Sequence, residues 1–302
     1  MEDAMKECSL QPVKRAKLIQ VEGVALPDWI LDMWEGVKKF QAYPDDLLIA
    51  TYPKAGTTWI QEIVDMILNE GDLEKCQRAP THERIPFLEC NEMPPYPSGL
   101  DMIAAMTPPR VIKTHLPFQL VPQSFWEQDC KAIYVARNAK DNLVSFFFFD
   151  KMCRDQPDPG TWDEYFWKFL SGQISWGSWY DHVKGWWKHK DKQRILYLFY
   201  EDMKEDPKRE IKKVIHFLEK DLPDEVVNKI VYHTSFEIMK NNPMANYSFV
   251  PDQVFNQSVS QFMRKGAVGD WKNHLTVAQN EIFDADYRDK MADMTLSFRN
   301  EL

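Results

Sequence analysis

The sequence has no apolar stretch long enough to cross a membrane. Its most apolar segment, Leu143 to Phe149, is far shorter than the roughly 20 residues that a spanning helix needs. Residues 1–18 contain neither the apolar core of a secretory signal nor the Met-Gly start that myristoylation requires. We therefore expect a cytoplasmic protein that does not associate with membranes.

Basic residues are too few for a chain that binds nucleic acid. Lys and Arg number 37 against 46 Asp and Glu, a formal net charge of −9. Bulk binding to nucleic acid needs a net basic face, so we expect no such partner. A small anionic ligand is still compatible with this charge where basic residues gather locally.

Cysteine is scarce, whereas aromatic residues are plentiful. The five cysteines are odd in number and none lies in a C-x-x-C pair. Without a secretory signal, we expect reduced thiols and no zinc or other metal site. Aromatic residues make up 13% of the chain. This content fits either an aromatic core or an aromatic-lined pocket.

Short apolar runs alternate with helical patterns along the chain. The runs predict buried strands at 47–51, 111–114, 132–135 and 195–200. Apolar residues at three- and four-residue steps and helix-start signals predict helices at 57–70, from Ala139, at 162–187, at 209–220 and at 276–294. This alternation predicts an α/β fold with a central parallel sheet flanked by helices.

The domain prediction follows from composition. Residues 1–20 are polar and mixed in charge, so we expect a flexible arm. No linker or repeat interrupts the rest, and residues 21–302 are expected to form a single domain. The proline-rich stretch 78–110 is expected to be mostly loop.

The strongest chemical signal runs from Thr51 to Trp59. A strand leads into a tight loop, where Gly56 lets the backbone approach an anion and the next helix begins with unpaired N–H groups. Thr57 and Thr58 add hydroxyl donors, and Lys54 adds a mobile positive charge. The lysine precedes the glycine, unlike the usual P-loop. The simpler alternative is a plain turn with a threonine N-cap.

Two further segments suit anions. Arg137 ends the strand 132–135, where ligands bind in open α/β sheets, and its planar fork suits a phosphate. Ser145 follows two helical turns later. Residues 264–272 combine three cations with two glycines, which suits a loop folded over an anion. A capping arginine and a solvated turn are the alternatives, but the three segments together predict a ligand with two separate phosphate groups.

His115 is the candidate proton acceptor. It follows the strand 111–114 directly and lies two residues after Lys113. A histidine with an ordinary pKa near 6.5 can take up a proton at neutral pH. Other histidines are given ordinary surface or core roles, namely His82, His182, His189 and His233.

These motifs resemble those of the cytosolic sulfotransferases, family 1, in their phenol-type branch. The resemblance runs from about Phe40 to the C-terminus. The segments that carry it are YPKAGTTW (52–59), KTHLP (113–117), YVARNAKDNLVS (134–145), LYLFYEDMK (196–204) and FMRKGAVGDWK (262–272). The stretches KAGTTW and NPMANYS are most similar to the C branch. The resemblance implies in-line transfer of a sulfuryl group from 3'-phosphoadenosine 5'-phosphosulfate (PAPS) to a small phenol, without a metal.

The resemblance also implies roles for individual residues. His115 would be the base, Lys54 would stabilise the leaving phosphate, and Lys113 and Ser145 would complete the catalytic set. The donor would be held by Lys54, Ala55, Gly56, Thr57, Thr58, Trp59, Arg137, Ser145, Tyr200, Thr234, Phe236, Phe262, Met263, Arg264, Lys265 and Gly266. The acceptor would be held by Phe87, Lys113, His115, Phe149, Tyr247 and Phe255.

The chain departs from the family pattern at several positions. Cys90 stands where several relatives have phenylalanine, and Phe146–Phe149 replaces a run that mixes tyrosine and histidine. Both changes alter the expected pocket. Ala55 replaces a serine whose side chain is not expected to contact the donor. Separately, Lys272–Glu281 matches a K-x-x-x-T-V-x-x-x-E pattern that implies a homodimer. The alternative is a helix start with Thr276 as N-cap.

Two rival functions are compatible with parts of the sequence. The segment ILYLFYED resembles a Walker-B strand, with Glu201 and Asp202 as magnesium ligands of a kinase-like phosphotransferase. The required Walker-A order is missing. A non-catalytic nucleotide-binding module is the second rival, and it leaves Lys54, Lys113 and His115 unexplained.

Overall fold

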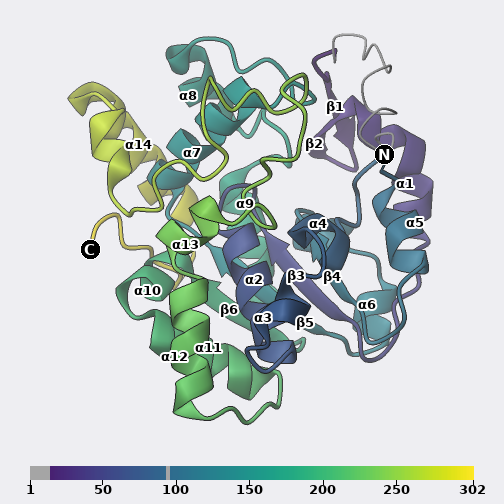
Figure 1. Cartoon of the computed structure of the whole chain (residues 1–302). Helices are drawn as coiled ribbons and strands as arrows, with labels where there is room; N and C mark the ends of the chain where they lie inside the picture. Colours follow the sequence, from purple (N-terminus) through teal and green to yellow (C-terminus); the bar gives the residue numbers. More distant parts are fainter. Residues whose placement is uncertain (1–13, 93–95) are drawn as a thin grey trace.

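A parallel four-stranded sheet lies at the centre of the molecule (Figure 1). The structure is a computed structural model that describes residues 14–92 and 96–302. The sheet has the order β4-β3-β5-β6, with strands β3 (Leu47–Thr51), β4 (Val111–Thr114), β5 (Lys131–Ala136) and β6 (Ile195–Phe199). All of its pairings are parallel. The predicted α/β fold with a central parallel sheet is confirmed.

Helices pack around this sheet. The longer ones are α1 (Leu31–Lys38), α2 (Thr57–Leu68), α7 (Ala139–Met152), α8 (Trp162–Ser171), α9 (Trp179–His189), α11 (Pro207–Phe217), α12 (Asp224–His233) and α14 (Val277–Met291). The shorter ones are α3 (Leu73–Cys76), α4 (Thr81–Arg84), α5 (Gly99–Ala104), α6 (Ser124–Glu127), α10 (Tyr200–Glu205), α13 (Phe236–Asn241), and the 3₁₀ turns η1 (Asp28–Ile30), η2 (Phe118–Leu120) and η3 (Asp270–Asn273). No helix in the described ranges is both long and apolar enough to span a membrane.

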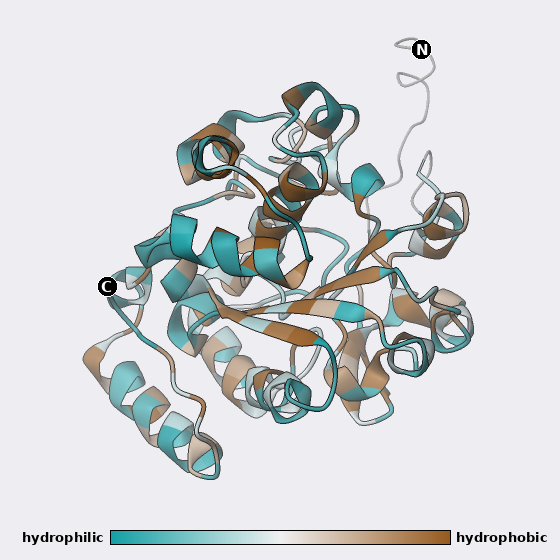
Figure 2. Cartoon of the chain, turned by 90° about the horizontal axis from the view of Figure 1, so that it is seen from below, coloured by the Kyte–Doolittle hydropathy of each residue, from teal (hydrophilic) through white to brown (hydrophobic). Residues whose placement is uncertain are grey.

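Both faces of the sheet are buried. Along β3, Leu47 and Ile49 pack into one apolar core with α2, α11 and α12, whereas Leu48 and Ala50 pack into a second core with α7, α8 and α9. Successive side chains of a strand point to opposite faces, so one continuous apolar run serves both cores. Figure 2 shows the central strands largely in brown between helices that carry teal surfaces.

The strand order creates a natural ligand site. The chain passes from β3 to β4 on one side of β3, and then to β5 on its other side. Ligands of open α/β sheets bind at the carboxyl ends of the strands beside such a reversal. The segments that follow β3, β4 and β5 therefore converge on one place.

The segment 162–187, predicted to be helical, forms two helices, α8 and α9. The connection between them contains three residues with positive φ: Gly172 at 71°, Trp176 at 65° and Gly177 at 73°. An α-helix cannot continue through left-handed residues. The proline-rich stretch 78–110 is mostly loop, but it also contains α4 and α5.

Regular structure begins closer to the N-terminus than predicted. Residues 1–13 of the expected arm lie outside the described residues. Leu18–Val21 forms β1 and pairs antiparallel with β2 (Val24–Pro27). Arg15 donates to the carbonyl oxygens of Asp150 (2.5 Å) and Cys153 (2.9 Å). The predicted arm boundary at residue 20 therefore misses an ordered strand.

Candidate functional site

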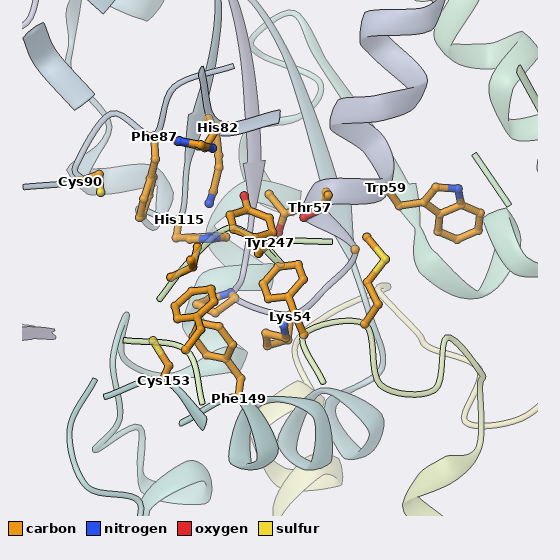
Figure 3. Close-up of a pocket in the computed structure, with 18 of the residues that line it drawn as sticks. Lys54, Thr57, Trp59, His82, Phe87, Cys90, His115, Phe149, Cys153 and Tyr247 are labelled. Atoms are coloured by element: carbon orange, nitrogen blue, oxygen red, sulfur yellow. The ribbon is translucent and has the colours of Figure 1, made fainter. Parts of the chain in front are cut away.

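A cavity of about 370 Å³ opens at the carboxyl ends of β3, β4 and β5 (Figure 3). Its wall includes every donor and acceptor residue predicted from the sequence except Ala55. Ala55 is fully buried, and its N–H donates to the carbonyl oxygen of Tyr52 at 3.2 Å. Its expected membership of the donor site is therefore not supported by the geometry.

The loop after β3 presents free backbone donors to this cavity. Gly56 precedes α2 with a φ of 103° and supplies no side-chain cap. A β-carbon at this position would lie 2.9 Å from the Tyr200 ring, so the backbone approaches its neighbours closely. Because the first N–H groups of α2 have no helical partner, the Thr57 and Thr58 end of this helix is suited to an anion.

Lys54 lies between two aromatic rings. Its Nζ is 4.4 Å from the ring centre of Phe149 and 4.1 Å from that of Phe262. Burial lowers the pKa of Lys54 to about 7, and the positive charges of Arg137 and Lys113 act in the same direction. A negatively charged ligand beside Nζ would reverse this effect and stabilise the ammonium.

The tautomer of His115 follows from its hydrogen bonds. Its Nδ1 lies 2.8 Å from the carbonyl oxygen of Thr51. A carbonyl can only accept, so Nδ1 carries the proton and Nε2 has the free lone pair. Burial, aided by the charge of Lys113, holds the pKa of His115 well below its usual value. The ring projects between Phe87 and Tyr247 in Figure 3.

Glu89 supports this arrangement and was not predicted. Its carboxylate accepts from the backbone N–H of His115 at 2.6 Å and from the Thr114 hydroxyl at 2.8 Å. Burial raises the pKa of Glu89 to about 7. Lys113 extends over the Phe87 ring, 4.1 Å from its centre, and burial lowers the pKa of Lys113 to about 8.

At the end of the cavity near Arg137, several buried N–H donors have no protein partner among the described residues. Arg137 stacks over Tyr200 and donates to the carbonyl oxygens of Lys54 (3.1 Å) and Ala267 (3.2 Å). Its Nε is buried and has no partner among the described residues, and the same holds for Arg264 Nε and Trp59 Nε1. Buried donors of this kind are normally satisfied. Their number fits a ligand rich in acceptor oxygens and ring nitrogens.

A glycine keeps this end open. Gly266 has a φ of 61°, and a β-carbon there would lie 2.1 Å from the Phe236 ring. Ser145 lines the same cavity as Arg137, although the sequence left its direction open. Trp59 meets Tyr200 edge to face at 5.5 Å between ring centres. The result is a narrow, aromatic-walled slot beside the anion loop, suited to a purine base.

The acceptor end contains residues that the sequence did not single out. They include Trp29, His82, Tyr96, Cys153, Asp155, Gln156, Trp176 and Phe249. His82, to which the sequence gave an ordinary role, lines the cavity. His182 keeps such a role: it is buried between the His115 carbonyl oxygen and the Tyr134 hydroxyl. Of the run 146–149, only Phe149 lines the cavity.

The proposed magnesium ligands of the kinase alternative have other partners. Glu201 is buried and accepts from the backbone and side-chain N–H groups of Asn138, at 2.8 and 2.9 Å. Asp202 pairs with Arg299. Neither lines the cavity. Within the described part of the chain, no three His, Cys, Asp or Glu residues are grouped to hold a metal ion.

Comparisons with known proteins agree with this site. Residues 44–295 match the sulfotransferase domain family. Sulfotransferase 1 family member D1 of Rattus norvegicus is 57% identical over 96% of this chain and 98% of the relative. Sulfotransferase 1C2 of Homo sapiens is 58% identical over 96% and 97%, respectively.

Solved structures agree with these sequence relatives. A mouse sulfotransferase crystallised with PAP has a TM-score of 0.75 and 31% identity, over 91% of this chain and 94% of the other. Retinol dehydratase with androsterone and PAP has a TM-score of 0.85 at 23% identity, covering 94% and 92%, and supports the fold alone. The kinase alternative is not favoured. The family predicted from the motifs is confirmed, C branch included, and the chain belongs to the sulfotransferase 1 family.

Proposed function

We propose that the chain is a cytoplasmic enzyme that transfers a sulfuryl group from PAPS to the hydroxyl of small phenols. One observation carries the proposal. The free lone pair of His115 and the ammonium of Lys54 face a single cavity whose acceptor side is aromatic. The family membership of the chain and the PAP bound by a related sulfotransferase support PAPS as the donor.

His115 takes the proton of the acceptor hydroxyl through Nε2. A phenol with an ordinary pKa near 10 is mostly protonated at neutral pH, so attack on sulfur needs a base. The bond from Nδ1 to Thr51 holds the ring and keeps the lone pair on the other nitrogen. The low pKa of His115 keeps the base unprotonated at neutral pH.

Lys54 stabilises the negative charge that develops on the departing side. When bound, PAPS supplies the sulfuryl group and a leaving phosphate. The buried ammonium of Lys54 acts where water is scarce, so its electrostatic effect is larger than in solvent. Lys113 provides a second positive charge next to the base. Arg137 and Ser145, with the segment 264–266, are positioned to bind the separate 3' phosphate.

Aromatic side chains select flat acceptors. Phe87, Phe149, Tyr247 and Phe255 surround the space next to His115, and they can stack on a phenol ring. Sugars and peptides need many polar partners, which these rings do not offer. A small phenolic acceptor is therefore the proposed substrate class.

The test is transfer of labelled sulfate from PAPS to 4-nitrophenol in the presence of EDTA. A labelled product that depends on the phenol is the expected result. Labelled product that forms only after magnesium is added would contradict a reaction without a metal. PAP binding without any product from a panel of phenols would contradict the proposed acceptor class, and absence of PAP binding would contradict the donor.

We also propose a homodimer through Lys272–Glu281. In this segment, Val277 opens α14 with 77% of its side chain exposed. Thr276 caps the helix by accepting from the N–H of Gln279, as the simpler alternative expected. A cap does not account for the exposed valine, and a two-fold contact would bury it.

A further inference from the structure

His82 lines the acceptor end of the cavity without a protein hydrogen bond. Both of its ring nitrogens are buried, and neither has a partner in the described residues. The nearest carboxylate, on Glu83, is 3.9 Å from Nε2, which is beyond hydrogen-bond range. Buried polar side chains are normally satisfied, so this ring requires an explanation.

Aromatic packing holds the ring in place. His82 stacks on Phe249 with 4.7 Å between ring centres and an angle of 19°, and it meets Tyr96 edge to face at 5.2 Å. Tyr247, a predicted acceptor contact, lies 6.3 Å away. Figure 3 shows His82 on the same side of the cavity as Phe87 and Tyr247. The stack fixes the plane of the ring, so its polar edge lies in this plane beside the aromatic side chains.

The ring is uncharged at neutral pH. Burial lowers the pKa of His82 to about 4, and the charge of Lys113 acts in the same direction. A neutral imidazole offers one N–H donor and one lone-pair acceptor. An uncharged hydroxyl can bond to either ring nitrogen, since it can accept from the N–H or donate to the lone pair. An ammonium can only donate and is repelled by Lys113, whereas a carboxylate can only accept.

We propose that His82 is a specificity-determining residue that hydrogen-bonds a second, uncharged hydroxyl of the acceptor. The preferred acceptors are then aromatic compounds with two hydroxyl groups. One reacts at His115 and the other binds His82. This inference rests on the proposed function, because both concern the same cavity.

Matched acceptors test the inference. Diphenols of increasing hydroxyl separation are each paired with the compound that lacks the second hydroxyl, and kcat/KM is corrected for the number of hydroxyls. For at least one separation, the wild type should favour the diphenol. His82→Phe keeps the aromatic stack but removes both polar groups, and should lower that preference about tenfold, the effect of one good hydrogen bond. The kcat/KM for the monophenol, measured in the same variant, is the reference for this preference, so a general effect of the substitution on the pocket cancels.

Two controls accompany this variant. His82→Gln keeps an amide donor and acceptor, and should restore part of the preference. His216→Phe makes the same chemical change at an exposed position of α11 and should leave the preference unchanged. Thermal unfolding of each variant verifies that it folds.

Several outcomes would overturn the inference. The first is that the wild type has the same kcat/KM for every diphenol and for its monophenol partner, a result that needs no variant. An unchanged preference in His82→Phe is another. A preference for hydroxybenzoates or aminophenols over diphenols would assign the site to a charged group. If monophenols are sulfated normally, only this inference fails; if no phenol is sulfated, the proposed function fails with it.

Discussion

The Nδ1 of His115 lies 2.8 Å from the carbonyl oxygen of Thr51, the last residue of the neighbouring strand. The base is therefore held by the backbone of the strand that leads into the anion loop. Its tautomer depends on the sheet rather than on a neighbouring carboxylate. One consequence for pH dependence can be measured.

We expect turnover to persist in mild acid. The pKa of His115 lies well below its usual value, so the base stays unprotonated from pH 7.5 to 6.0. With saturating substrates, kcat should change by less than twofold between pH 7.5 and 6.0. If the base had a pKa of 6.5, kcat would fall about fourfold over the same range. His115→Ala should reduce kcat on the order of a hundredfold, with His216→Ala as the exposed control. A fourfold loss in the wild type would contradict the low pKa.

Donor binding should take up a proton. The pKa of Lys54 is about 7 in the free enzyme, and a bound phosphate raises it. Between the pKa of Lys54 in the free enzyme and its higher pKa in the complex, affinity for PAP should fall as pH rises, by up to about tenfold per pH unit. Calorimetry from pH 7 to 9 in two buffers of different ionisation enthalpy counts the proton directly. No uptake at pH 8 in the wild type would show that Lys54 is already charged before binding.

Replacing Lys54 by methionine should separate binding from chemistry. The change keeps most of the length of the side chain and removes its charge. We expect kcat to fall a hundredfold or more, on the order of 3 kcal/mol, as for the loss of one oxyanion donor. The proton uptake at pH 8 should decrease as well. Lys212→Met, on the exposed side of α11, is the matched control, and equal kcat in both variants would remove Lys54 from the mechanism.

Gly266→Ala should weaken donor binding. The new β-carbon would lie 2.1 Å from the Phe236 ring, in a residue with a φ of 61°. Overpacking of this kind costs about 1–3 kcal/mol, so the Kd for PAP should rise roughly tenfold. Gly23 has a φ of 83° with no atom within 4 Å of the new carbon. Gly23→Ala therefore carries the backbone strain alone, and an equal Kd in the two variants would exclude the clash.

Arg15→Ala should weaken acceptor binding selectively. The guanidinium donates to carbonyl oxygens at the end of α7 and in the loop that carries Asp155 and Gln156. Losing these bonds costs on the order of 2 kcal/mol, and the thermal midpoint should fall by a few degrees. Acceptor KM should rise several-fold while the Kd for PAP is unchanged. Arg154→Ala removes an exposed arginine of the same loop, and a similar rise in KM there would refute the specific role.

Val277→Glu should convert a dimer into a monomer. A charge on this exposed side chain would oppose its own copy across a two-fold axis. Light scattering after gel filtration reports the mass. Leu31→Glu adds the same charge on α1, where the side chain is 56% exposed, and should leave the mass unchanged. A wild-type monomer at micromolar concentration would remove the proposed interface.

Local segments were predicted well, and long-range neighbours were not. Lys54, Gly56 and Thr57 are close neighbours in the sequence, at the junction of a loop and α2. Their anion-binding chemistry could therefore be predicted from one short segment. Glu89 reaches His115, and His82 reaches the cavity, only through tertiary contacts, and no spacing pattern marks them.

The break after α8 has a different origin. Gly172, Trp176 and Gly177 have left-handed conformations within the aromatic-rich sequence 162–187. The glycines are ordinary helix-stop signals, whereas the tryptophan carries no turn signal. Conversely, the burial of β3 on both faces was predictable, because its apolar run Leu47–Ala50 has no polar interruption.

The register between β3 and β4 has a consequence for inactivation. Ala50 pairs with Thr114, so Lys54 and His115 inherit their separation from the hydrogen-bond ladder. A slip of one residue would move the base by about 3.3 Å and turn it to the opposite face. No partly open form of this strand pair can therefore retain turnover. Loss of activity in denaturant should coincide with hydrogen–deuterium exchange of the β3 and β4 amides, and should lag behind fraying of the outer helices.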